Sequence, residues 1–316
     1  LTLGATTLNN GGEVLSDGDL NLALGGDLNN SGLISSAKAV SIAAGNLVQN
    51  GGRIASAGAT TLNLRGSLDN LGRLVAGQNL LVHATQVNNR GTLGAMGQLD
   101  IFAGNGISTG ADTLIYSGAD MNLRGASLSN FYGDIYSKGN LSFAGLDGGQ
   151  AQSLSNRSAN IESEGDMTLN VASLENRKDV FEMGESLVSR RIDINCTDCS
   201  GKHHTATFIV NSTYQGKVIK DSAGARLIAG RDLFITAGTV ENKQSLLAAN
   251  RDAFVKAANF YNRGATLDQR VESTTYFLHG VKKSAFRWAE AHTNLWNSRN
   301  AASAPDQQEA LPVAVT

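Results

Sequence analysis

Cys196, Cys199 and two adjacent histidines form the densest group of reactive side chains in this 316-residue sequence. The two cysteines are the only ones in the chain, and His203 and His204 follow within five positions. Cysteine and histidine at such spacing are the ligands that Zn²⁺ prefers. However, adjacent histidines on a strand point in opposite directions, and nine residues leave little chain to surround a metal ion. The residues alone leave a metal site, a disulfide and free thiols open; a redox-active pair lacks its strand-to-helix context.

The cysteine pair lies in a segment whose composition differs from the rest of the chain. Residues 177–220 concentrate basic and aromatic side chains, and His204–Val210 alternates like a strand. Residues 211–216 are typical of a turn, and Lys217–Lys220 is expected to return as a second strand, so we predict a β-hairpin. Recognition is commonly carried by loops on a rigid scaffold, although surface loops also tolerate extra length without a partner. The candidate binding residues are Phe181, Arg190, Arg191, His203, His204, Phe208 and Tyr214.

The scaffold on both sides of this segment is a repeat of about 20 residues in which a hydrophobic residue, a spacer and an asparagine recur. The pairs are Leu8/Asn10, Leu28/Asn30, Val48/Asn50, Leu68/Asn70, Val87/Asn89, Leu128/Asn130, Leu154/Asn156, Leu174/Asn176, Val240/Asn242 and Phe260/Asn262, with weaker copies at Thr109 and Ala223. Between them lie short alternating runs separated by Gly, Asn or Asp, which indicate strands and turns.

Stacking is the way such units can bury their apolar faces, because a single unit cannot form a core alone. Parallel strands would place Leu, Ile and Val in continuous columns, and asparagines would form hydrogen-bonded ladders between turns. We expect the 36 glycines to supply positive φ at the corners. Parallel crossovers are right-handed, so we predict an all-β protein, a right-handed parallel β-helix with a β-hairpin-like insertion and a short helical C-terminal segment.

These patterns divide the chain into four segments: β-helix repeats at 1–176, the insertion at 177–220, further turns at 221–267 and a capping or linker segment at 268–316. In the last segment, helical spacing relates Val281, Ala285, Trp288, His292 and Leu295. We expect this helix to pack on the last turn and cover its open edge. A helix that binds a partner or a membrane surface is the alternative, and residues 300–316 are expected to form a linker.

Composition excludes several classes of function. The net charge is −2 with dispersed charges, which gives no basic surface for nucleic acid. No apolar run approaches the ~18 residues of a transmembrane helix. Aspartates are scattered at corners, and no Ser/His/Asp set or paired carboxylates are evident. We therefore predict that the chain is not an enzyme and has no cofactor.

The asparagine-anchored units resemble the filamentous haemagglutinin repeats of two-partner secretion exoproteins. Leu68–Gly77 and Leu128–Ser137 show the pattern, and the resemblance covers about residues 1–176 and 221–267. It implies export through a partner transporter in the outer membrane and display on the Gram-negative cell surface. In a secreted protein, two close cysteines more often form a disulfide, so a Cys196–Cys199 disulfide without metal is favoured. Because the chain opens at Leu1 inside the pattern, we expect it to be part of a longer protein.

The chain is most similar to CdiA-type contact-dependent growth inhibition proteins, in which a receptor-binding region follows the first repeats. The resemblance implies a surface filament that binds an outer-membrane protein or glycolipid receptor on a neighbouring bacterium, with any toxin outside this sequence. The insertion is then the expected receptor-binding site. The alternative is a haemagglutinin-type adhesin that binds host glycan or matrix.

Overall fold

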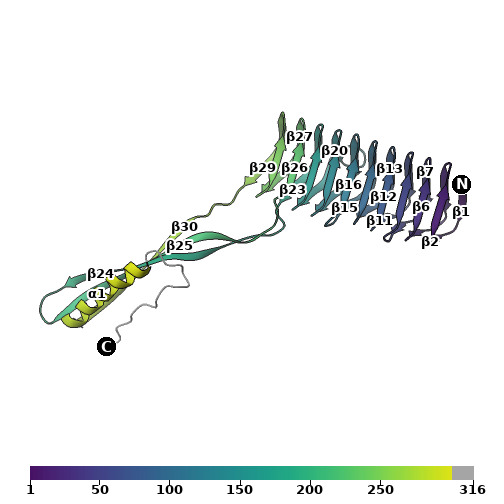
Figure 1. Cartoon of the computed structure of the whole chain (residues 1–316). Helices are drawn as coiled ribbons and strands as arrows, with labels where there is room; N and C mark the ends of the chain where they lie inside the picture. The colour runs from purple at the N-terminus through teal and green to yellow at the C-terminus, as the bar shows by residue number, and fades with distance from the viewer. Residues whose placement is uncertain (301–316) are drawn as a thin grey trace. The chain divides into compact units, whose positions relative to one another are not determined.

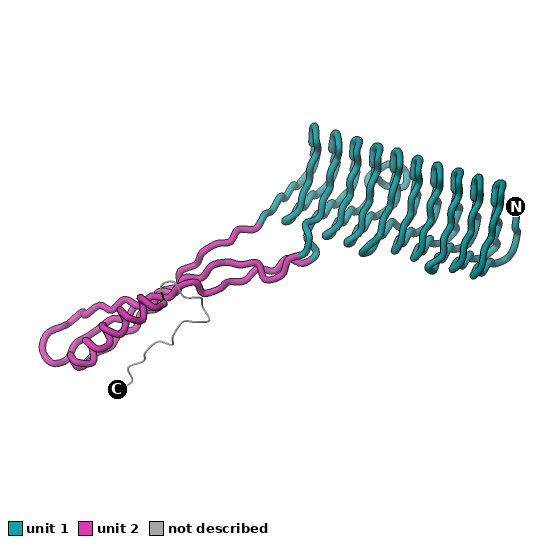
Figure 2. The backbone as a smooth tube through the Cα atoms, in the orientation of Figure 1, with its two compact units in different colours: residues 1–179, 222–264 teal, residues 180–221, 265–316 magenta. Residues whose placement is uncertain are grey.

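The computed structural model describes residues 1–300, which form two compact units. Unit 1 consists of Leu1–Asp179 and Ser222–Gly264, and unit 2 consists of Val180–Asp221 and the chain from Ala265 onward (Figure 2). The first excursion into unit 2, Val180–Asp221, therefore nearly coincides with the predicted 177–220 insertion, although it starts three residues later and ends one residue later. The predicted linker beyond residue 300 lies outside the described residues.

Unit 1 is a parallel β-helix whose strands stack turn upon turn (Figure 1). The first strands of the short turns are β1 (Thr2–Ala5), β4 (Leu20–Leu24), β7 (Val40–Ala44), β10 (Thr60–Leu64), β17 (Met121–Gly125) and β20 (Leu141–Ala144). The second strands are β2 (Leu8–Asn10), β5 (Leu28–Asn30), β8 (Leu47–Gln49), β11 (Ser67–Asn70), β18 (Ser127–Phe131) and β21 (Ala151–Arg157). Long strands span both positions in β13 (Leu80–Asn89), β15 (Leu99–Thr109), β23 (Met167–Arg177), β27 (Leu233–Lys243) and β29 (Ala253–Arg263).

The third strand of each turn belongs to a separate parallel sheet. Its members are β3 (Glu13–Ser16), β6 (Leu33–Ser36), β9 (Arg53–Ser56), β12 (Arg73–Ala76), β14 (Thr92–Ala95), β16 (Leu114–Ser117), β19 (Asp134–Ser137), β22 (Asn160–Ser163), β26 (Arg226–Ala229) and β28 (Leu246–Ala249). Buried and exposed side chains alternate along most strands, so that Leu20, Leu22 and Leu24 are buried while Asn21 and Ala23 face outward. Pairing in register places Leu22, Ile42 and Leu62 above one another. The predicted parallel β-helix is confirmed.

Buried asparagines form a hydrogen-bonded ladder inside unit 1. Asn130 donates through Nδ2 to Asn156 Oδ1 at 3.0 Å, and Asn156 donates to Asn176 Oδ1 at 2.9 Å. Asn176 donates in turn to Asn242 Oδ1 at 2.8 Å. The same amides also donate to backbone carbonyls of the third strands, as Asn156 does to Arg226 O at 3.0 Å. The ladder therefore ties the turns together and also ties two sheets together.

The ladder corrects two positions of the predicted repeat. Gln49, and not Asn50, occupies its third place: Gln49 is paired in register with Asn30 and donates to Asn70 Oδ1 at 3.0 Å. Ala223 has no place in it, because Asn176 bonds directly to Asn242. The excursion into unit 2 consequently leaves and re-enters the β-helix within one turn. β22 pairs with β26 and β23 with β27 as if the intervening residues were absent.

The glycines of unit 1 mostly serve close packing between turns, which corrects the expectation of positive φ. Among the described glycines, positive φ is confined to Gly51, Gly106, Gly148, Gly201 and Gly280. At Gly118, in contrast, a Cβ atom would fall inside van der Waals contact of the Met96 carbonyl oxygen in the preceding turn. A Cβ atom at Gly18 would meet open space. Corner glycines such as Gly118 are therefore needed because backbones approach each other closely.

Replacing Gly118 with alanine is expected to destabilise unit 1 by about 1–3 kcal/mol, the usual cost of inserting atoms into a well-packed site. The clashing atom belongs to the backbone, so the turn itself must shift. The matched change Gly18→Ala is expected to be neutral or slightly stabilising, because alanine restricts the unfolded chain. Urea unfolding followed by circular dichroism measures both; equal stabilities for the two variants would contradict the close-approach argument.

Unit 2 contains a β-hairpin in the insertion, as predicted, but its strands are not the predicted ones, and a third strand and a helix extend it. β24 (Phe181–Asp198) pairs antiparallel with β25 (His203–Asp221), which pairs antiparallel with β30 (Gln269–Lys282). The turn of the hairpin lies at residues 199–202. The predicted turn at 211–216 is wrong: these residues continue β25 without a break. The error arises because Asn211, Ser212 and Gly216 are typical turn residues, whereas pairing with β24 on one side and β30 on the other keeps this stretch extended as far as Gln215.

The C-terminal helix, α1 (Lys283–Asn300), exists but packs differently from the expectation. It contacts β24, β25 and β30 of unit 2, and the β29 edge of the last turn is exposed. Its buried side chains are Phe286, Thr293 and Trp296. Asn297 fastens it to β24 by donating to Ile192 O at 2.7 Å and accepting from Ile192 N at 2.9 Å. No described helix is both long and apolar enough to span a membrane.

The residues predicted to form the buried face of the helix are also wrong. Val281 belongs to β30, and Trp288 and Leu295 are 44% and 48% exposed. The His292 ring stacks on the Trp288 ring, with centroids 3.8 Å apart, on the exposed side of the helix. The buried face of the helix carries Phe286, Thr293 and Trp296, each one position after a residue of the predicted stripe. Both sets recur at helical spacing, so the spacing alone does not distinguish them.

Candidate binding surface of unit 2

The seven predicted binding residues all lie on β24 and β25, but they do not form one patch. Phe181 pairs with Asp221 at one end of the hairpin, and Cys196 pairs with Ala206 near the other. Ten residues separate His204 from Tyr214 along one extended strand, which corresponds to about 33 Å. A single ligand site containing all seven is therefore not what the hairpin offers.

The two arginines differ in their availability. Arg190 is partly buried, and its Nε donates to Ser212 Oγ at 3.0 Å across the strand pair. The side chain of Arg191 is 71% exposed and pairs with Asp193 Oδ1 at 2.8 Å along the same strand face. Exposed ion pairs of this kind contribute little to stability, so Arg191 can exchange Asp193 for a carboxylate or phosphate of a partner at little cost and is the more available of the two arginines.

Tyr214 lies in a charged cluster that joins all three strands. The Arg270 guanidinium lies over the Tyr214 ring, 4.5 Å from its centroid. Arg270 also donates to Glu185 at 2.8 Å and to Glu272 at 3.3 Å. The hydrogen bond from Arg270 holds the pKa of Glu185 below its usual value, and the hydrogen bonds to Glu185 and Glu272 raise the pKa of Arg270. This cluster fixes β30 against the hairpin.

The aromatic and histidine candidates are divided between exposed and buried positions. Phe181 and Phe208 are half-buried, and His203 is exposed. His204 is only 5% exposed, and its ring lies 5.4 Å from the Phe286 ring of α1. The opposite orientations of the two histidines follow from alternation along β25. His204 is therefore not available to a macromolecular partner, whereas His203 is.

The most exposed apolar side chains of unit 2 lie on β30, which was assigned to a capping or linker segment from the sequence. The three most exposed are Phe277 at 68%, Val271 at 62% and Tyr276 at 56%, and Leu278 on the same strand is 45% exposed. Within the described residues, β30 pairs only with β25, so its other edge is unpaired. The signal that could have located this strand is the run Val271–Leu278, which is rich in β-branched and aromatic residues.

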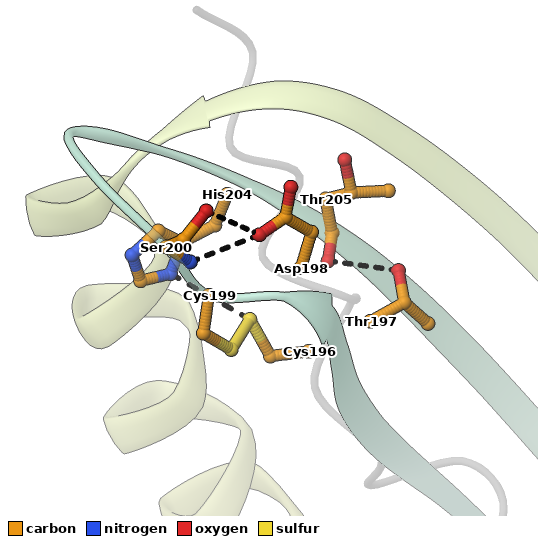
Figure 3. The surroundings of a disulfide bond; sticks show 7 residues. All are labelled: Cys196, Thr197, Asp198, Cys199, Ser200, His204 and Thr205. Atoms are coloured by element: carbon orange, nitrogen blue, oxygen red, sulfur yellow. Dashed lines mark hydrogen bonds between the residues drawn. A yellow bond between two sulfur atoms is a disulfide. The ribbon is translucent and has the colours of Figure 1, made fainter.

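The turn of the hairpin holds the cysteine pair (Figure 3). The sulfur atoms of Cys196 and Cys199 are joined in a disulfide, with Cα atoms 5.8 Å apart. Asp198 accepts hydrogen bonds from the backbone N–H of Ser200 at 3.0 Å and from its hydroxyl at 2.7 Å. These two bonds, the backbone one first, lower the pKa of Asp198. The turn is thus held both covalently and by a charged cap.

The comparisons with known proteins give one result. The chain matches the family described as Haemagglutinin repeat over residues 1–63, 48–101, 94–182 and 217–273, which together make up more than half of it. Neither the curated proteins nor the solved structures contain a match. Proteins with these repeats are typically secreted, adhesin-like surface filaments of two-partner secretion, structural in role and not known as enzymes. Most of unit 1 and few residues of unit 2 carry the match, and the chain belongs to the haemagglutinin repeat family.

Proposed function

We propose that the chain is the receptor-binding part of a contact-dependent growth inhibition exoprotein of the CdiA type. In this proposal unit 1 is the filament, and unit 2 binds an outer-membrane protein or glycolipid on a neighbouring Gram-negative bacterium. The full-length protein would reach the cell surface through a partner transporter in the outer membrane and deliver a toxin encoded elsewhere in it.

The observation that supports this role most strongly is the exposed apolar surface of β30. Monomeric proteins rarely leave contiguous apolar groups exposed, and such groups mark interaction sites. Side chains alternate along β30, so Tyr276 and Leu278 share one face of the sheet, where they are 56% and 45% exposed, and Phe277, 68% exposed, lies on the other. The exposed guanidinium of Arg191 adds a charged contact. Aromatic and arginine side chains are the groups that carry most binding energy in interfaces.

The alternative, an adhesin that binds host glycan or matrix, would use unit 1. Its support is the pair Tyr116 and Tyr136, which stack on successive turns with ring centroids 6.1 Å apart and are both partly exposed. Stacked aromatic rings of this kind could carry a sugar ring.

Replacing Phe277 with serine is expected to weaken binding of the chain to intact Gram-negative bacteria at least about tenfold, because hot-spot aromatics contribute 2 kcal/mol or more. The matched control is Phe254→Ser, which removes a phenylalanine of β29 that is 54% exposed in unit 1. Flow cytometry with labelled protein measures binding to bacteria and, in parallel, to host epithelial cells.

Two results would contradict the proposal. One is binding to host cells without binding to bacteria, which would favour the adhesin. The other is an equal loss for Phe254→Ser and Phe277→Ser, which would move the site away from unit 2. Circular dichroism of both variants confirms that the fold is retained.

A further inference from the structure

The hairpin turn of unit 2 brings together three side chains that the proposed receptor binding does not use. Cys196 lies near the end of β24, Cys199 begins the turn, and His204 is the second residue of the returning strand β25. Their ligand atoms all lie within 4.8 Å of one another, and Cys196 Sγ lies 3.7 Å from His204 Nδ1 (Figure 3). His203 is excluded from this cluster because it points to the other face of β25.

The sulfur–nitrogen distance fits the coordination of a tetrahedral metal ion, whereas the two bonded sulfur atoms must separate before both can be ligands. With Zn–S bonds of about 2.3 Å and Zn–N bonds of about 2.0–2.1 Å, tetrahedral angles separate a sulfur and a nitrogen ligand by about 3.6 Å. The observed 3.7 Å between Cys196 Sγ and His204 Nδ1 matches this separation. Two residues between the cysteines are also the spacing common in zinc-binding turns.

The packing of His204 decides which of its ring nitrogens faces the cysteines. The imidazole is 95% buried against Phe286. The only hydrogen-bond contact that the structure describes for this ring is the one between Nδ1 and the cysteine sulfur. Packing therefore holds the ring with Nδ1 toward the sulfur, where no other group competes for its lone pair.

We propose that the hairpin turn binds Zn²⁺, or another soft divalent cation, whenever the cysteines are in the dithiol form. Cys196 Sγ, Cys199 Sγ and His204 Nδ1 are the protein ligands, and water takes the fourth position. Binding releases the two thiol protons, since the thiolate is the ligand. The disulfide form holds no free thiolate and binds no metal. A newly made chain carries thiols, so this is the form in which the turn can hold the metal.

The test uses the whole chain, a phosphine reductant and Co²⁺ as the probe. The phosphine takes an oxygen atom from water while the disulfide takes up two electrons and two protons to become two thiols. Co²⁺ added to the reduced chain is expected to give the thiolate charge-transfer and intense d–d absorption of a tetrahedral site, and Zn²⁺ is expected to displace it. The oxidised chain is expected to show neither signal.

Substitutions of the two histidines distinguish the proposed ligand, His204, from its neighbour, His203. His204→Ala is expected to weaken Co²⁺ binding at least about tenfold, the lower bound for disturbing even an outer-shell partner, and His203→Ala is expected to leave it unchanged. His204→Cys keeps a ligand at this position and is expected to restore binding, so a folding defect in His204→Ala is distinguishable from ligand loss. Three results would each overturn the proposal. The first is Co²⁺ binding by His204→Ala as tight as that of the unaltered chain, and the second is an equal loss of binding in His204→Ala and His203→Ala. The third is thiolate–cobalt absorption in the oxidised chain.

Discussion

Replacing Asn156 with alanine is expected to lower the free energy of unfolding of unit 1 by about 3–5 kcal/mol. The Asn156 side chain is fully buried and takes part in four hydrogen bonds. Its amide donates to Asn176 Oδ1, Ala159 O and Arg226 O, and its oxygen accepts from Asn130. Each lost bond costs about 0.5–1.5 kcal/mol, and a buried group left without a partner costs about 1–3 kcal/mol. Guanidinium unfolding followed by circular dichroism is the measurement.

The matched control for this prediction is Asn160→Ala in the following strand. Its side chain donates one hydrogen bond, to Asp134 Oδ1 at 2.8 Å, at a site open to solvent. We expect a loss below about 1 kcal/mol, because water replaces that partner. The backbone oxygen of Asn160 remains available to the Asn130 amide in this variant. If the two alanine variants were equally stable, the ladder would not be a main source of cohesion between turns.

Unit 1 could be predicted from the sequence because the same pattern of a hydrophobic residue, a spacer and an asparagine recurs about every 20 residues. A single short run such as Leu28–Asn30 does not reveal its secondary structure or which side chains point inward. The recurrence of the run establishes both the period of the repeat and the inward-facing positions. The errors arose where turns vary in length. The third copy was placed at Asn50 because Asn50 and Gln49 are adjacent amides, and only the pairing of Leu47 with Leu28 shows which of them points inward.

Unit 2 was predictable in outline only, because its stability depends on partners that are distant in sequence. The strand β30 pairs with β25 across more than fifty residues, and no local pattern encodes that pairing. Arg270 and Tyr214 are likewise brought together only by the folded sheet. The exposed surface of β30 could not be predicted for this reason, whereas the disulfide was favoured because the repeats resemble those of secreted proteins.

Removing unit 2 is expected to abolish binding to bacteria and leave unit 1 folded. The ends of the first excursion meet at one side chain: Ser158 Oγ accepts from the backbone N–H of Asp179 at 2.9 Å and lies 2.7 Å from Ser222 Oγ. A short Gly-Ser link can therefore join Asp179 to Ser222. β23 and β27 already pair directly, so the link adds no strain to the core. Ending the same chain at Gly264 removes the remainder of unit 2.

The most direct test of separate roles for the two units is a comparison of two chains. The shortened chain and the full 316-residue chain are each measured for binding to intact Gram-negative bacteria. The far-ultraviolet circular dichroism and melting behaviour of the shortened chain show beforehand that the β-helix persists. We predict that the shortened chain does not bind and does not compete with the full chain. Binding or competition by the shortened chain at the strength of the full chain would contradict the assignment of recognition to unit 2.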